Sequence, residues 1–343
     1  MAEGARAVPF RRAYAFFRRH PILLFLCFTP GIPEYLSGSS MLVGLASFPS
    51  VILVLLFLGL NLGLYGPGVL LVREAFVRWR PGWGGLLLMG AAYGLLEEGT
   101  ALSTLFNPHA QVVGGLGSYG RFAGVNWVWT AGVLGVHIVY SVGLPIVLLG
   151  LALPETRGRP LLTSRGIRFA VIVYLLDIVV LMLITRYVLE APLLVLGAGI
   201  VAALLFVGAR SLPHGTLDPR GPSPRISPKW FFLLGLAFYP ILLLVPAFGG
   251  RANLWPPATI AIDLALSGAL FLFVRREVGR AENEAALAML AFGAILPIVV
   301  FGLLAQLAVP IVLVADILYG LFFYTLWCRY RPIPSVTIPV GAT

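Results

Sequence analysis

Residues 167–189 read IRFAVIVYLLDIVVLMLITRYVL, and this stretch carries only three charged side chains, Arg168, Asp177 and Arg186. A helix needs roughly 20 mainly apolar residues to cross the hydrocarbon core of a bilayer. The stretch therefore predicts a membrane-spanning helix, and comparable runs recur along the whole chain.

The composition extends this prediction to the entire protein. Of the 343 residues, 59% are hydrophobic and only 11% are charged, whereas soluble domains carry about 25% charged residues. We therefore expect one all-α, polytopic membrane domain over residues 1–343. A Pro- and Gly-rich segment, 211–229, would join two possible halves, residues 1–211 and 230–331.

Ten membrane spans are expected, and the basic residues support that count. The spans cover approximately residues 20–38, 50–77, 83–105, 125–151, 167–189, 192–211, 230–248, 256–274, 286–305 and 308–328. Most basic residues fall in every second connection, and short cytoplasmic loops are the ones that collect Arg and Lys. The sequence thus predicts a multi-pass protein of a prokaryotic inner (cell) membrane with both termini cytoplasmic, Gly115 outside and Gly221 inside.

The positions of the basic residues also indicate which binding partners to expect. The net charge of +10 would suit nucleic acid, but basic residues confined to short loops between spans are explained by membrane orientation alone. We therefore expect the lipid bilayer as a partner and no nucleic acid.

Adjacent glutamates interrupt the third span. Residues 90–100 read GAAYGLLEEGT, so Gly90, Gly94 and Glu98 share one helix face, where small residues let another helix approach closely. Glu97 would lie about 100° around the helix from Glu98. Ionisable side chains inside a span are costly and usually mark function, so both glutamates are candidate catalytic residues.

The fourth span supplies a partner for these glutamates. Asn126, Thr130, His137 and Ser141 are spaced by 4, 7 and 4 residues, which places them on one helix face that should point into the protein. His137 can transfer a proton or bind a metal. We predict His137 as a third catalytic residue, and the other three polar residues as substrate-binding or supporting groups.

Two further residues are candidates for the same region, on the outer side. His109 lies in the Gly-rich connection between the third and fourth spans, and Glu34 lies near the outer end of the first span. A divalent metal such as zinc, bound by Glu98 and His137, would add Lewis acidity to the acid–base groups.

Residues 93–98, YGLLEE, followed by LGVH at 134–137, resemble motifs of the CPBP group of intramembrane proteases, which are relatives of the CAAX-processing endopeptidases. The resemblance implies an endopeptidase in which Glu97 or Glu98 activates water and His137 assists. It also implies a membrane protein or a lipidated peptide as substrate. Leu102 and Val133 replace an Arg and a Phe of the motifs, so a non-catalytic relative is an alternative.

Dispersed carboxylates indicate a different class of function. Asp177, Asp263 and Asp316 lie in three separate predicted spans, as a proton-coupled transporter or a channel would require. A compact cluster of Glu97, Glu98 and His137 would favour the hydrolase, and a polar pathway through the aspartates would favour the transporter.

Overall fold

The computed structural model describes residues 11–37, 50–219, 226–278, 284–306 and 312–330. These residues form a helical bundle, which confirms the all-α fold class, with one short β-hairpin between β1 (Arg121–Phe122) and β2 (Val125–Asn126). The α-helices are α1 (Arg11–Arg19), α2 (Pro21–Pro30), α4 (Val51–Trp79), α5 (Gly82–Gly94), α6 (Trp127–Val136), α7 (Leu144–Ala152), α8 (Ser164–Thr185), α9 (Pro192–Ser211), α10 (Pro228–Tyr239), α11 (Val245–Arg251), α12 (Pro256–Val278), α13 (Glu284–Gln306) and α14 (Val312–Tyr330).

Seven helical stretches within the described residues are long and apolar enough to cross a membrane: Val51–Trp79, Trp127–Ala152, Ser164–Thr185, Pro192–Ser211, Pro228–Arg251, Pro256–Val278 and Glu284–Leu304. Each coincides with one predicted span. In the other three predicted spans, the described residues fall mainly on α2, α5 and α14. The positions of about ten predicted spans thus agree with helices of the structure. Seven of these helices also meet the length and composition that a membrane span needs.

Helix ends follow local chemistry. The side chain of Ser50 accepts a hydrogen bond from the amide of Leu53 at the start of α4, and Thr163 caps α8 in the same way. Such caps satisfy amides that have no partner inside the helix. At the other end of α4, Arg80 adopts the left-handed conformation that stops a helix.

Within the described residues, four helices continue into a π-helical turn, in which the backbone bonds from residue i to i+5. These turns are η1 (Gly31–Tyr35), η2 (Leu95–Ala101), η4 (His137–Gly143) and η7 (Pro240–Leu244). They continue α2, α5, α6 and α10 without a break. π-helical turns are rare in proteins, but those that occur are often found at functional sites. Three of these four turns carry candidate residues predicted from the sequence, namely Glu34, the Glu97–Glu98 pair and His137.

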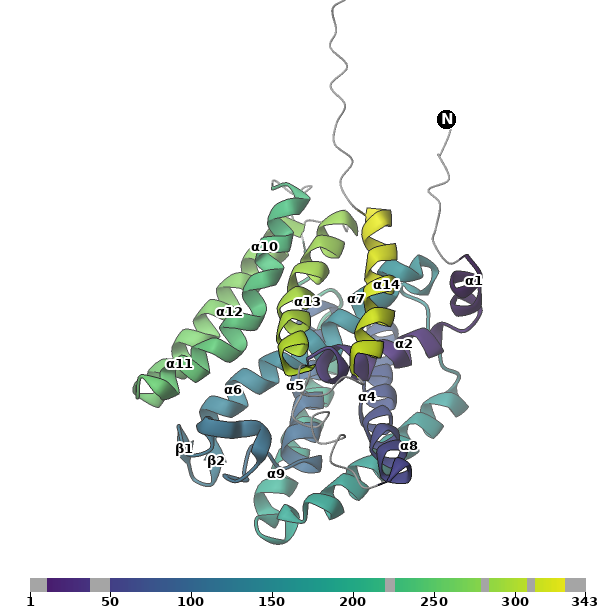
Figure 1. The fold of residues 1–343 in the computed structure, drawn as a ribbon. Coiled ribbons are helices and arrows are strands. Elements are labelled where there is room, and N and C mark those ends of the chain that lie inside the picture. The colour runs from purple at the N-terminus through teal and green to yellow at the C-terminus, as the bar shows by residue number, and fades with distance from the viewer. Residues whose placement is uncertain (1–10, 38–49, 220–225, 279–283, 307–311, 331–343) are drawn as a thin grey trace, which may run out of the picture.

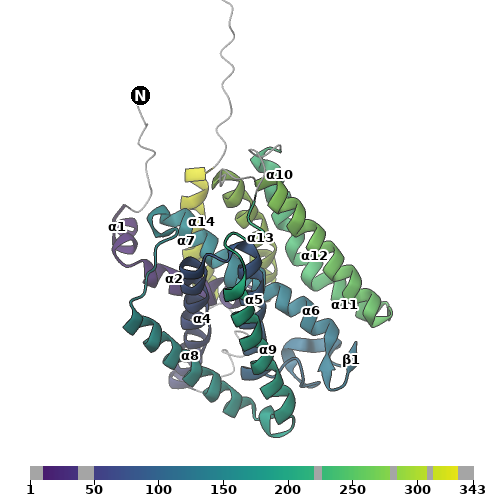
Figure 2. The same cartoon turned by 180° about the vertical axis from the view of Figure 1, so that it is seen from behind.

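The helices pack around α5 and η4, which contact each other near the middle of the bundle (Figure 1). Helices α4, α8 and α9 lie on one side of this pair, whereas α10, α11 and α12 form a neighbouring group on the other (Figure 2). Helix α13 packs mainly against α10 and also contacts α7 and α14. The proposed division into halves at 211–229 stays a prediction.

Candidate functional site

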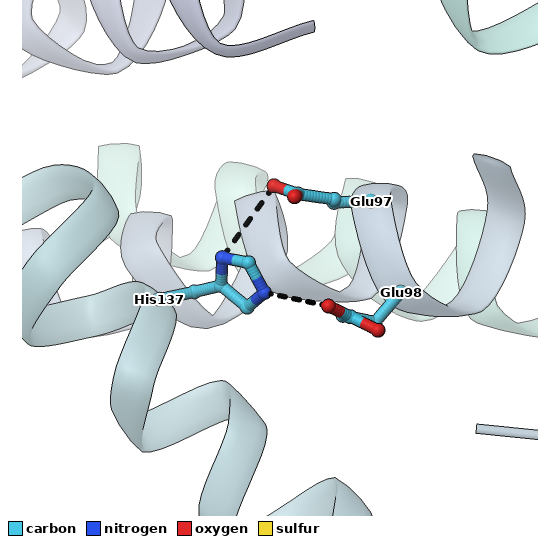
Figure 3. A group of neighbouring side chains, drawn as sticks. All are labelled: Glu97, Glu98 and His137. Carbon is cyan, nitrogen blue, oxygen red and sulfur yellow. Dashed lines mark hydrogen bonds and ion pairs between the residues drawn. The ribbon is translucent and has the colours of Figure 1, made fainter. Parts of the chain in front are cut away.

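His137 lies between the two glutamates, within the bundle. Its Nε2 atom is 3.1 Å from Oε1 of Glu98, and its Nδ1 atom is 3.4 Å from Oε2 of Glu97 (Figure 3). All three residues are buried, with exposed fractions of 1% for Glu97, 7% for Glu98 and 3% for His137. One ring thus contacts two carboxylates at opposite edges, and the sequence-predicted trio forms one cluster.

The π turns explain how both neighbouring glutamates reach the same ring. The amide of Leu102 donates to the carbonyl of Glu97 at 2.8 Å, an i to i+5 bond. A turn that holds more residues rotates less per residue, so adjacent side chains diverge less than the about 100° of an α-helix. Glu97 was expected off the helix seam, but the wider turn brings it onto His137 as well.

The glycine seam brings the two helices together, as the sequence predicted. A Cβ atom at Gly90 would lie 3.0 Å from Cα of Ile138, and one at Gly94 would lie 3.1 Å from Cβ of His137. Both approaches are at the limit of ordinary packing. Larger residues on this face would therefore separate the glutamates from His137.

Hydroxyl groups hold the outer edges of the cluster. Ser141 Oγ lies 2.9 Å from Nδ1 of His137. Thr104 donates to Oε2 of Glu98, and Nε1 of Trp129 donates to Thr104 at 3.2 Å. Glu98 and His137 therefore each have a second hydrogen-bond partner, Thr104 and Ser141 respectively, which fixes the orientation of their side chains.

Glu97 is held differently. Its Oε2 atom is buried and has no hydrogen-bond partner in the part of the chain that the structure describes. The rings of Tyr65 and Tyr93 lie nearby with centroids 6.2 Å apart, and Tyr93 packs edge-on against His137. Leaving a buried carboxylate oxygen unsatisfied is costly, so this atom is poised to bind a proton, a water molecule or a cation.

The remaining predicted site residues are divided between the cluster and its surroundings. Glu34 accepts a 2.7 Å hydrogen bond from the hydroxyl of Tyr65, which connects η1 to α4 beside Glu97. Asn126 is buried as the cap of α6, where its Oδ1 accepts from the amide of Trp129, and Thr130 donates to the carbonyl of Asn126. His109 is exposed in the loop before η3 (Gln111–Leu116). Glu34 and Ser141 thus adjoin the trio, while Asn126 and Thr130 bond to nearby backbone.

Sequence reasoning missed the tyrosines and Thr104. Their side chains are uncharged, so they do not carry the energetic cost that marks a carboxylate inside a membrane. Tyr93 did lie within the glycine seam, and its position between Gly90 and Gly94 was the available signal.

The donor set suits a divalent metal. Glu97, Glu98 and His137 each offer one ligand atom, and these atoms lie within 4.8 Å of one another. Carboxylate oxygens and imidazole nitrogens are both zinc ligands, and a catalytic zinc takes three protein ligands and keeps a further position for water.

The dispersed aspartates occupy separate helices. Asp177 lies on α8 against Gly63 of α4, Asp263 is buried on α12, and Asp316 lies on α14. Oδ2 of Asp177 and Oδ1 of Asp263 have no hydrogen-bond partner among the described residues.

Fold and site together define a polytopic helical membrane protein with a buried Glu-Glu-His cluster. The chain belongs to a family of membrane proteins that is described as uncharacterized, and the model of this family matches residues 23–329. The matched range includes every residue of the cluster. No curated protein and no solved structure matches the chain.

Proposed function

We propose that this protein is an intramembrane hydrolase of the protease type, with Glu97 as general base and with Glu98 and His137 completing the site. The observation that carries the proposal is the buried ring of His137 between two carboxylates, one of which has an oxygen with no hydrogen-bond partner among the described residues. The motif resemblance of residues 93–137 to CPBP proteases supports the same chemistry, whereas the family match supports only the location in a membrane.

The reaction follows from these contacts. Glu97 removes a proton from a water molecule as the water oxygen bonds to the carbonyl carbon of an amide. The carbon–nitrogen bond then breaks, and the proton passes to the leaving nitrogen, as in general acid–base catalysis. His137 offsets the negative charge of the two carboxylates, and Glu98, fixed by Thr104, keeps the ring oriented.

A divalent cation such as zinc, if bound, would be held by Glu98 and His137 with Glu97 adjacent. It would supply Lewis acidity toward the carbonyl oxygen.

The test measures the N-termini that cleavage creates in other membrane proteins. Membranes are compared from cells that carry different variants of this protein at matched protein levels. Glu97→Gln and His137→Ala should abolish termini that the unmodified protein produces, because the base or its partner is lost. The matched control is Asp177→Asn, which removes another buried carboxylate of a spanning helix and should leave these termini unchanged.

The control also discriminates the alternative, a transporter or channel that uses dispersed carboxylates. Asp177 and Asp263 keep unsatisfied buried oxygens, which a proton or cation pathway would use. If Glu97→Gln and His137→Ala leave all cleavage unchanged while Asp177→Asn abolishes a transport activity, the hydrolase proposal fails and the transporter replaces it.

A further inference from the structure

A small cavity adjoins Glu97. It is lined by residues of α4, α8 and η2, among them Asn61, Tyr65, Glu97 and Leu181. About 20 Å³ is available to the centre of a water molecule, and roughly 10–15 Å³ of such space suffices for one water. The cavity is therefore the size of a single water beside the proposed base.

Three polar side chains face this otherwise apolar space, and their hydrogen bonds limit what they can offer. The hydroxyl hydrogen of Tyr65 is donated to Glu34 at 2.7 Å, so its oxygen can only accept in any further bond. Asn61 donates one of its two Nδ2 hydrogens to the carbonyl of Phe57 at 3.1 Å, so only the second hydrogen of this nitrogen can be offered to the cavity. Glu97, as a carboxylate, accepts only.

We infer that this cavity holds the reacting water and that Tyr65 is a further catalytic residue, which accepts one hydrogen of that water while Glu97 accepts the other. The inference rests on the proposed hydrolase. With both hydrogens engaged, a lone pair of the water oxygen is directed away from Tyr65 and Glu97, toward the substrate carbonyl. Buried water needs two to four polar partners, and Tyr65 and Glu97 supply two.

Glu34 acts through Tyr65 as a positioning residue. Its carboxylate takes the only hydroxyl hydrogen of Tyr65, which otherwise would be free to bond to Glu97 and occupy the base. Glu34→Gln keeps an acceptor oxygen and should preserve activity, whereas Glu34→Leu should lose it. A purely structural role would lower the thermal unfolding temperature of Glu34→Leu together with its cleavage rate, whereas a positioning role lowers the cleavage rate and leaves the unfolding temperature unchanged.

The decisive experiment fills the cavity without touching an acid–base group. Leu181 is buried and lines the cavity, while Leu183, on the same helix, is 62% exposed. We expect Leu181→Phe and Tyr65→Phe each to lower the initial rate of cleavage roughly 100-fold, because a misplacement of about 1 Å can cost that much. Leu183→Phe is the matched control and should cleave at the full rate.

The rate is followed as the appearance of Glu97-dependent N-termini in membrane vesicles, with thermal unfolding in detergent as the check on folding. A double variant, Tyr65→Phe with Leu181→Phe, should be no slower than either single one, since both remove the same water.

Full cleavage by Leu181→Phe and Tyr65→Phe, with Glu97→Gln inactive, would overturn the water site and leave the hydrolase intact. Full cleavage by Glu97→Gln would overturn the hydrolase itself. If Leu181→Phe does not fold, the rate of Tyr65→Phe decides.

Discussion

At the residue scale, the two glutamates have different surroundings and should have different roles. Glu98 is tied to His137 and Thr104, whereas Oε2 of Glu97 has no hydrogen-bond partner within the described residues. Two carboxylates on one imidazole in a low-dielectric site are stable only if a proton or a cation offsets their charge. The residue with the free oxygen is the better acceptor for the proton of a water molecule.

We therefore predict that Glu97→Gln is more damaging than Glu98→Gln. Gln at position 97 cannot take a proton, and loss of a general base costs about 10²- to 10⁴-fold in rate. Gln at position 98 still offers one acceptor oxygen to Thr104 or His137, so a smaller loss is expected. Cleavage rates of both variants at equal protein levels check the order, and a more active Glu97→Gln would reverse the assignment of the base.

Arg73 offers a prediction on stability. It is buried at the end of α4, where it pairs with Glu74 at 2.8 Å and donates to the carbonyls of Thr156 and Arg159. Removing one member of a buried ion pair costs about 3–5 kcal/mol when the partner is left uncompensated. Here Arg78 still pairs with Glu74 at 3.2 Å, so we expect a loss toward the lower end of this range. Arg73→Met should thus markedly lower the thermal unfolding temperature in detergent.

The control for this change is Arg18→Gln. Arg18 pairs with Glu155 at 2.8 Å, but its side chain is 65% exposed, and exposed pairs contribute about 0–1 kcal/mol. Equal effects of the two variants would show that the Arg73 network adds nothing beyond a surface pair.

At the element scale, the approach of α5 to η4 positions His137. Gly94 leads into η2, and an added Cβ atom there would come within 2.8 Å of Leu134 and 3.1 Å of His137. We predict that Gly94→Ala moves η4 outward and reduces cleavage. Gly197→Ala on α9 is the control, since no atom lies within 4 Å of the added Cβ and Ala is favoured over Gly by about 1 kcal/mol in a helix. A cleavage rate that is equal in both variants would contradict the role of the seam.

Comparison of the helices with the sequence shows which features of the site could be predicted and which could not. Glycine spacing predicted the helix contact, and the cost of buried charge identified Glu97, Glu98 and His137. Periodicity assumed regular α-helices, however, and no sequence rule used here marks a π turn. Glu97 was therefore placed off the seam, although η2 turns it onto His137. Tyr65 went unnoticed because the role that we propose for it depends on Glu34, 31 residues away, and on a cavity formed by three elements.

At the scale of the whole molecule, the basic segments meet at one end of the bundle. Four Arg side chains make contacts between these segments: Arg18 of α1 pairs with Glu155 after α7, and Arg73 of α4 donates to the carbonyl of Arg159 before α8. Arg275 of α12 donates to the carbonyl of Leu217 in the loop after α9, and Arg329 of α14 donates to the carbonyl of Ala152 in α7. Helix α1 and the final turn of α14 lie toward the same end of the bundle (Figure 1). At the opposite end, Tyr119 bonds to Leu254 and Thr259, and Tyr187 bonds to Phe106. The alternation of basic and less basic connections along the chain thus becomes a separation in space.

This separation leads to a prediction on orientation. Short cytoplasmic segments collect Arg and Lys, so the basic end should face the cytoplasm and the loop with Tyr119 should face outward. Gly115 in that loop is exposed and has open space for an added side chain. Gly221 lies outside the described residues, but His214, in the same connection, is exposed and serves as the inner position.

The measurement is cysteine labelling in a background without Cys27 and Cys328, the two native cysteines. A membrane-impermeant maleimide should label Gly115→Cys in intact cells and His214→Cys only after the membrane is opened. The positions lie at opposite ends of the bundle, since the loop with His214 bonds to the start of α5 through Thr216 and Gly84, whereas the loop with Gly115 packs on α11. Labelling of His214→Cys alone in intact cells would show that the protein has the opposite orientation, with its basic end outside, and would contradict the prediction from the Arg distribution.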